Sequence, residues 1–64
     1  MPSKKPPEEP EYVEYWAREL VKAAGKRDAR RILEDYRAIA RNPRVSKRDR
    51  DIAKQRVKIL AKIL

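Results

Sequence analysis

The single glycine, Gly25, and the pair Asn42-Pro43 divide the sequence into three stretches in which apolar residues recur at helical spacing. Glycine readily adopts the left-handed conformation that ends a helix, and the residue before a proline is disfavoured in the α conformation. No stretch alternates apolar and polar residues as a half-buried strand does. The pattern therefore predicts an all-α protein with helices at about residues 8–24, 28–41 and 47–64.

The links between these helices are short, so consecutive helices should run antiparallel. Asp28 can cap the second helix, and Ser46 with Asp49 resembles a capping box at the start of the third. Residues 1–7 contain three prolines, two lysines and a serine, a composition that favours extended, solvated backbone. We predict an antiparallel three-helix bundle over residues 8–64, preceded by a short, disordered, proline-rich tail.

A chain of 64 residues forms one domain at most, and without cysteine it has neither disulfides nor a thiolate metal site. Its large apolar side chains are thirteen Val, Ile and Leu, one Trp and three Tyr. Burial of this set is needed almost entirely to offset the entropy lost on folding. A deep ligand pocket would compete with the core for the same side chains.

The residue types that carry catalysis are mostly missing. Histidine, the usual general base near neutral pH and the commonest metal ligand, is absent, and so is threonine. Ser3 and Ser46 are the two serines, and one glycine cannot make a phosphate-binding loop. We therefore predict that the protein is not an enzyme and uses no cofactor or metal.

The charge is strongly positive and unevenly distributed. The formal net charge is +8, from 18 Lys and Arg against 10 Asp and Glu. Up to Gly25 there are four basic and five acidic residues, whereas from Lys26 onward there are fourteen basic and five acidic. The positive field therefore belongs to the second and third predicted helices, and it suits an anionic partner.

No apolar stretch is long enough for a membrane span, and the N-terminal residues lack the apolar segment of a signal peptide. We therefore expect no membrane insertion and recognise no targeting signal. The cellular location stays open.

The third predicted helix carries two apolar stripes with Arg56 between them. One stripe is Ala53, Val57, Leu60 and Leu64, and the other is Ile52, Ile59 and Ile63. If both stripes face one core, Arg56 must pack its stem and pair its guanidinium with an acidic group or a helix end. Alternatively, one stripe remains exposed as a partner-binding strip for an acidic protein surface, formed by Ile52, Arg56, Ile59 and Ile63.

Nucleic-acid binding is the alternative to a protein-binding role. Residues 39–46, Ile-Ala-Arg-Asn-Pro-Arg-Val-Ser, resemble the end of a helix-turn-helix motif over a short part of the chain. Two positions depart from that family: Arg44 stands where a glycine supplies positive φ, and Arg50 stands where an aliphatic side chain is buried. The resemblance implies a small basic DNA-binding domain whose contacts to DNA come from Arg44, Lys47, Arg48, Arg50 and Lys54.

The whole chain also resembles de novo designed helical mini-proteins, because it is short, rich in Ala, Arg and Lys, and has Gly25 and Ser46 at helix boundaries. Its many arginines and its proline-rich start depart from the family's average. The resemblance implies an idealised bundle, expected to be monomeric, that serves as a non-catalytic scaffold or a protein-binding module.

Overall fold

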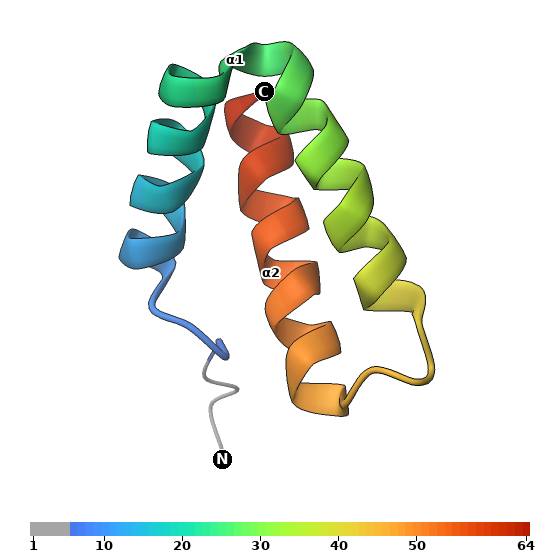
Figure 1. Ribbon diagram of the computed structural model, residues 1–64. Coiled ribbons are helices and arrows are strands. Elements are labelled where there is room, and N and C mark those ends of the chain that lie inside the picture. The colour runs from blue at the N-terminus through green and yellow to red at the C-terminus, as the bar shows by residue number, and fades with distance from the viewer. Residues whose placement is uncertain (1–5) are drawn as a thin grey trace.

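The computed structural model describes residues 6–64, which form two helices, α1 (Pro10–Arg41) and α2 (Lys47–Ile63). Within these residues there is no strand, so the all-α prediction is confirmed. Most of the predicted tail, residues 1–5, lies outside the described residues. Figure 1 shows that α1 is sharply bent and that α2 packs against both of its halves.

The prediction of a three-helix bundle was wrong, because the chain does not leave the helix for a loop at Gly25. Helical turns continue on both sides of this residue, and Gly25 alone has non-helical angles, φ 84° and ψ 164°. Asp28, which we expected to cap a separate helix, lies inside α1. The two stretches predicted as separate helices are therefore arms of one element, which we call the first arm (residues 10–24) and the second arm (residues 26–41).

α1 begins two residues later than predicted. Pro10 occupies its first turn, where a missing N–H is not needed for a helical bond, and Glu9 precedes it in extended backbone. The N–H of Val13 donates to the carbonyl of Glu9 at 3.1 Å. At the other end Asn42 is extended, and its N–H donates to the carbonyl of Ile39 at 3.1 Å. The predicted stop before Pro43 is therefore confirmed.

α2 begins as its sequence predicts. The Ser46 hydroxyl accepts a hydrogen bond from the N–H of Asp49 at 3.2 Å, which satisfies one of the free N–H groups of the first turn. At the C-terminal end the N–H of Leu64 donates to the carbonyl of Leu60 at 3.0 Å. Neither helix is both long and apolar enough, within the described residues, to span a bilayer.

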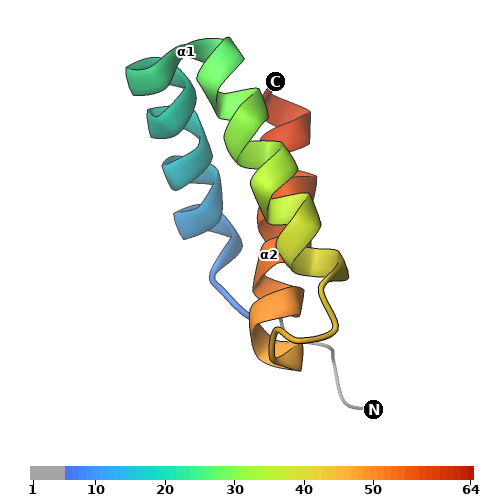
Figure 2. The ribbon, with the colours of Figure 1, turned by 45° about the vertical axis from the view of Figure 1, so that its right-hand side comes forward.

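The core is small and lies where the two arms meet α2. Its buried cluster takes one residue from each segment: Ala17 from the first arm, Leu33 from the second arm and Leu60 from α2. Figures 1 and 2 show α2 running alongside both arms. The partly buried residues around this cluster are Trp16, Leu20, Val21, Val57, Ile59, Ile63 and Leu64. Because α1 folds back at Gly25, α2 has two apolar neighbours rather than one.

Candidate functional site

Arg56 forms the central polar contact of the protein, an ion pair with Glu8. Its Nε donates to Glu8 Oε1 at 2.8 Å, and its Nη2 donates to Glu8 Oε2 at 3.1 Å. The side chains of Arg56 and Glu8 are only 15% and 21% exposed. Two parallel charge-assisted bonds make this a forked pair, which is stronger and more directional than a single contact.

Two aromatic rings complete the surroundings of the guanidinium, one from each arm of α1. Its carbon lies 4.5 Å from the centre of the Trp16 ring and 5.7 Å from that of Tyr36. Arg56 Nη1 donates to the Tyr36 hydroxyl at 3.3 Å. The two rings meet edge to face with centres 5.5 Å apart. Arg56 therefore links α2 to both arms and keeps favourable cation–π contacts where water is scarce.

Gln55 holds the backbone of the same glutamate. The N–H of Glu8 donates to Gln55 Oε1 at 3.0 Å, and Gln55 Nε2 donates to the carbonyl of Glu8 at 2.8 Å. Both backbone groups of one residue are thus bonded to one side-chain amide. The segment before α1 is attached to α2 by four hydrogen bonds, two through its backbone and two through its carboxylate.

This environment shifts the acid–base equilibria of both charged groups. The hydrogen bond from Arg56 holds the pKa of Glu8 below its ordinary value of 4.5, although burial opposes the shift. The same bond raises the pKa of Arg56, against the opposing effect of burial. Both groups are therefore charged at neutral pH, and their charges favour the pair.

The predicted partner-binding strip is divided by this arrangement. Ile52, Ile59 and Ile63 are all partly buried. Ile52 lines a hollow beside the second arm, whereas Ile59 and Ile63 line another hollow with Pro10 and Glu14 of the first arm. Because the two arms flank α2, its two apolar stripes each have an intramolecular neighbour.

Arg56, predicted at the centre of that strip, has its guanidinium engaged by Glu8 and Tyr36. The first of the two interpretations, in which the stem packs and the guanidinium is paired, fits these contacts. The partner of Arg56 could not be identified from the sequence, because Glu8 lies 48 residues away and no local pattern links the two.

The residues predicted to contact nucleic acid lie in the connecting loop and along α2. Arg44, Lys47, Arg48 and Lys54 are exposed. Arg50 is partly buried, and its Nε lacks a hydrogen-bond partner among the described residues.

The connection between the second arm and α2 does not reproduce a helix-turn-helix turn. Among residues 6–64 only Gly25 has positive φ, so Arg44 does not take the glycine-like conformation of that motif. The second arm and α2 run in opposite directions side by side (Figures 1 and 2), whereas the helices of the motif cross at a wide angle.

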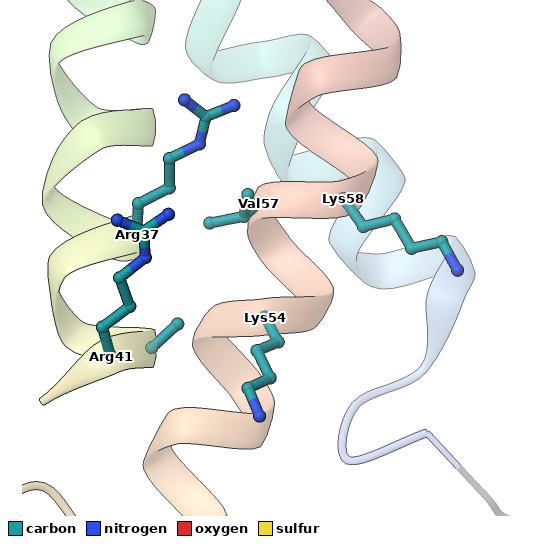
Figure 3. A pocket seen from close by; sticks show the side chains of 6 residues that line it. Arg37, Arg41, Lys54, Val57 and Lys58 are labelled. Atoms are coloured by element: carbon teal, nitrogen blue, oxygen red, sulfur yellow. The ribbon is translucent and has the colours of Figure 1, made fainter. Parts of the chain in front are cut away.

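A basic groove lies between the second arm and α2. It is an open hollow of about 300 Å³, lined by Arg37, Ala40, Arg41, Lys54, Val57 and Lys58. In Figure 3 the side chains of Arg37 and Arg41 run along the second arm and Val57 points toward them. Lys54 and Lys58 extend outward from α2. Ala40 and Val57 are the apolar residues of the lining, and the other four lining residues are basic.

Among residues 6–64, one of these four cations has an acidic partner. Arg37 Nη1 lies 2.9 Å from Glu34 Oε1, in a contact that is largely exposed. Arg41, Lys54 and Lys58 make no ion pair within the part of the chain that the structure describes. The groove therefore carries a net positive charge even if the exposed Arg37–Glu34 pair is counted as neutral.

Of the groove's cations, Lys54 alone is among the residues predicted to contact nucleic acid. Arg37 and Arg41 are four residues apart, as are Lys54 and Lys58, so each pair lies on one helix face. That spacing was readable from the sequence. The fact that the two faces meet was not, because it depends on how the second arm packs on α2.

In the described residues, no group of three or more His, Cys, Asp and Glu is placed to hold a metal ion. No family model, curated protein or solved structure matches the chain. The candidate functional sites are the basic groove and the cluster around Arg56.

Proposed function

We propose that the protein is a non-catalytic helical binding module that holds an acidic segment of another protein in the basic groove. The observation that carries this proposal is a hollow lined by two apolar and four basic residues, of which three make no ion pair among residues 6–64. Arginine is enriched at protein interfaces, and a field of one sign speeds the approach of an oppositely charged partner.

The apolar residues of the lining favour an acidic protein segment over a nucleic acid. Ala40 and Val57 can cover an apolar side chain, while Arg41 and Lys58 pair with carboxylates on either side of it. A sugar-phosphate backbone offers anionic groups but no apolar side chain for these residues. The best ligand is therefore a peptide in which an apolar residue stands between acidic ones.

The resemblance to designed helical mini-proteins supports the same class of role, a scaffold or a binder. A scaffold made only to fold would give no saturable binding of such a peptide. The binding experiment therefore separates these two roles.

The test is a titration with the peptide acetyl-Glu-Glu-Leu-Glu-Glu-amide, followed by NMR shifts of the protein's amide signals. We expect saturable shifts centred on Ala40 and Val57, and affinity that falls as salt is added, because the cations are exposed and are screened by salt. Shifts spread evenly over the basic surface, or none, would contradict the proposal.

A matched pair of double variants locates the site. Arg41→Gln with Lys58→Gln removes two charges from the groove, and Lys22→Gln with Arg31→Gln removes two exposed charges elsewhere on α1. We expect about a tenfold loss of affinity in the groove variant, corresponding to about 1.4 kcal/mol, and a much smaller loss in the control. Equal losses would show that only total charge matters.

Nucleic-acid binding is the alternative outcome, favoured by the exposed Arg44, Lys47 and Arg48 near the start of α2. A short DNA duplex is titrated in parallel at two salt concentrations. Duplex binding that survives moderate salt and is lost on Arg48→Gln, together with no saturable peptide binding, would replace the proposed function with DNA binding.

A further inference from the structure

We infer that Gln55 and Arg56 form a second binding site, for an extended peptide segment that carries a glutamate, and that Glu8 of this chain is its resident occupant. An extended acidic segment of a partner protein takes the same place by displacing residues 6–9. This site shares no residue with the basic groove and does not depend on it.

The contacts of Glu8 show how such a ligand is recognised. Gln55 bonds both the N–H and the carbonyl of one residue, at 3.0 and 2.8 Å, as a neighbouring strand would. On the ligand side these bonds involve only the backbone N–H and carbonyl, so Gln55 can bind any extended residue other than proline. The forked pair with Arg56 then selects a carboxylate. Together the two side chains specify a glutamate in extended backbone.

The receptor side of the contact is held in place independently of the ligand. Trp16 and Tyr36 contact the guanidinium from the two arms of α1, and the Tyr36 hydroxyl accepts its third hydrogen bond. Arg56 therefore needs little reordering when a carboxylate arrives or leaves. Such preorganisation lowers the entropy cost of binding.

The contacts of the resident segment are concentrated at Glu8, and its other residues are exposed. Pro6, Pro7 and Glu9 are exposed, and Glu9 makes no side-chain capping bond to α1. The core cluster contains no residue of this segment. Residues 6–9 can therefore leave α2 without breaking the core, which makes exchange with an outside segment feasible.

Because Glu8 belongs to the same chain as the site, it competes with any outside ligand. This competition sets how strongly such a ligand must bind. A short tether gives the resident segment an effective concentration of the order of millimolar. A weak free peptide therefore binds only when Glu8 is removed from the site. This requirement provides a direct test in the full-length chain.

The experiment uses the full chain with Glu8→Lys, whose ammonium is repelled by Arg56, and the peptide acetyl-Pro-Pro-Glu-Glu-Pro-amide. Trp16 is the chain's only tryptophan and contacts Arg56, so its fluorescence reports on the site. We expect a saturable change with half-saturation in the millimolar range for E8K, and no change for the unmodified chain in that range. The Gln analogue, acetyl-Pro-Pro-Gln-Gln-Pro-amide, should bind at least tenfold more weakly.

Two further variants make the result specific. Adding Gln55→Ala to E8K removes both backbone bonds and should weaken binding at least fivefold. Adding Arg41→Gln and Lys58→Gln removes groove charges and should change binding less than threefold. If E8K has lost its helical circular dichroism, the same titrations are made with Glu8→Ala.

The proposal is overturned if no saturable change appears, if the Gln peptide binds as well as the Glu peptide, or if the unmodified chain binds equally. Binding that depends on Arg41 and Lys58 but not on Gln55 would place the peptide in the groove. That result would reject the second site and leave the proposed function standing.

Discussion

At the scale of single residues, Arg56 shows how a partly buried guanidinium can be stabilised beside a small helical core. Its stem lies on α2 between two apolar stripes, and its charge is met by one carboxylate, one hydroxyl and two ring faces. Leaving such a charge without its partner is costly, because the partly dry surroundings do not replace the lost bonds. The sequence showed that Arg56 stands between two apolar stripes, where an unpaired charge is costly. It did not show that Glu8 is the partner.

Replacing Glu8 by Gln should therefore destabilise the protein. We expect a loss of about 1–2 kcal/mol in the free energy of unfolding at neutral pH, because the charge is removed while the size is kept. The loss should be smaller than for a fully buried pair, since both side chains retain some contact with water. Urea unfolding measures it, with Glu34→Gln as the control for an exposed pair; equal losses in the two variants would contradict this account.

The same pair predicts an acid-dependent loss of stability. The pKa of Glu8 is lower in the folded protein than its ordinary value of 4.5, so the unfolded chain binds this proton more readily. The stabilisation is therefore fully present well above pH 4.5 and is lost as the pH falls from there through the folded-state pKa. Thermal unfolding at a series of pH values measures this loss.

Glu8→Gln is the control for this pH dependence, because it removes the titrating group. Its melting temperature should fall less steeply over the acid range than that of the unmodified chain. Parallel curves would mean that other carboxylates account for the acid dependence.

At the scale of elements, α1 is governed by Gly25. The combination of φ 84° and ψ 164° belongs to a region that is essentially restricted to glycine. A Cβ added here would meet nothing within 4 Å, so a substitution is opposed by the backbone and not by crowding. The fold-back that brings both arms onto α2 therefore depends on this one conformation.

Gly25→Ala should destabilise the protein by about 1–3 kcal/mol, the usual cost of placing a side-chain-bearing residue in such a conformation. Synthetic chains allow a sharp control: D-alanine at position 25 accepts positive φ and should retain the stability of the unmodified chain or exceed it. The midpoint of urea unfolding measures both. If L- and D-alanine behave alike, the conformation of Gly25 does not limit stability.

α2 depends on a local signal at its start. Ser46→Ala removes the acceptor for the N–H of Asp49 and should cost about 0.5–2 kcal/mol. Ser46→Asp preserves an acceptor and adds a favourable charge at the helix N-terminus, so it should recover most of the loss. Thermal unfolding by circular dichroism distinguishes the two. Equal melting temperatures for the Ala and Asp variants would show that the cap is not used.

At the scale of the whole molecule, stability rests on few contacts. The buried cluster contains two leucines and an alanine, one from each helical segment, and Leu60 is completely buried. A small domain has little free energy of unfolding to lose. A single large vacancy in this cluster should therefore affect all three segments together.

Leu60→Ala should cost about 2–5 kcal/mol, because it removes buried surface and leaves a cavity. Ile39→Ala is the matched control, since Ile39 is of similar size but 37% exposed, and it should cost clearly less. Chemical unfolding measures both. A loss for Ile39→Ala that equals the loss for Leu60→Ala would place the stabilising contacts outside this cluster.

The sequence alone determined where helices form and stop and how the charge is distributed. Pro10, Ser46 and the Asn42-Pro43 pair act on neighbouring backbone groups, so their effects can be read locally: the start of α2 and the end of α1 lie where they were predicted, and α1 starts two residues later. The predicted helix boundaries at residues 24 and 28 were wrong. The position of the bend was also readable from Gly25. The sequence did not show whether a loop or a resumed helix follows Gly25, because a helix can resume directly after one glycine.

Only the tertiary structure decided which faces meet. Helical periodicity shows which residues share a face, but it does not say which other segment covers that face. The bond from Arg56 to Glu8 spans 48 residues, and the basic groove joins Arg41 to Lys58 across two elements. The Arg56 site exists because α1 folds back at Gly25 and both arms reach α2, whereas the groove needs only the packing of the second arm on α2. These long-range contacts have no local signature in the sequence.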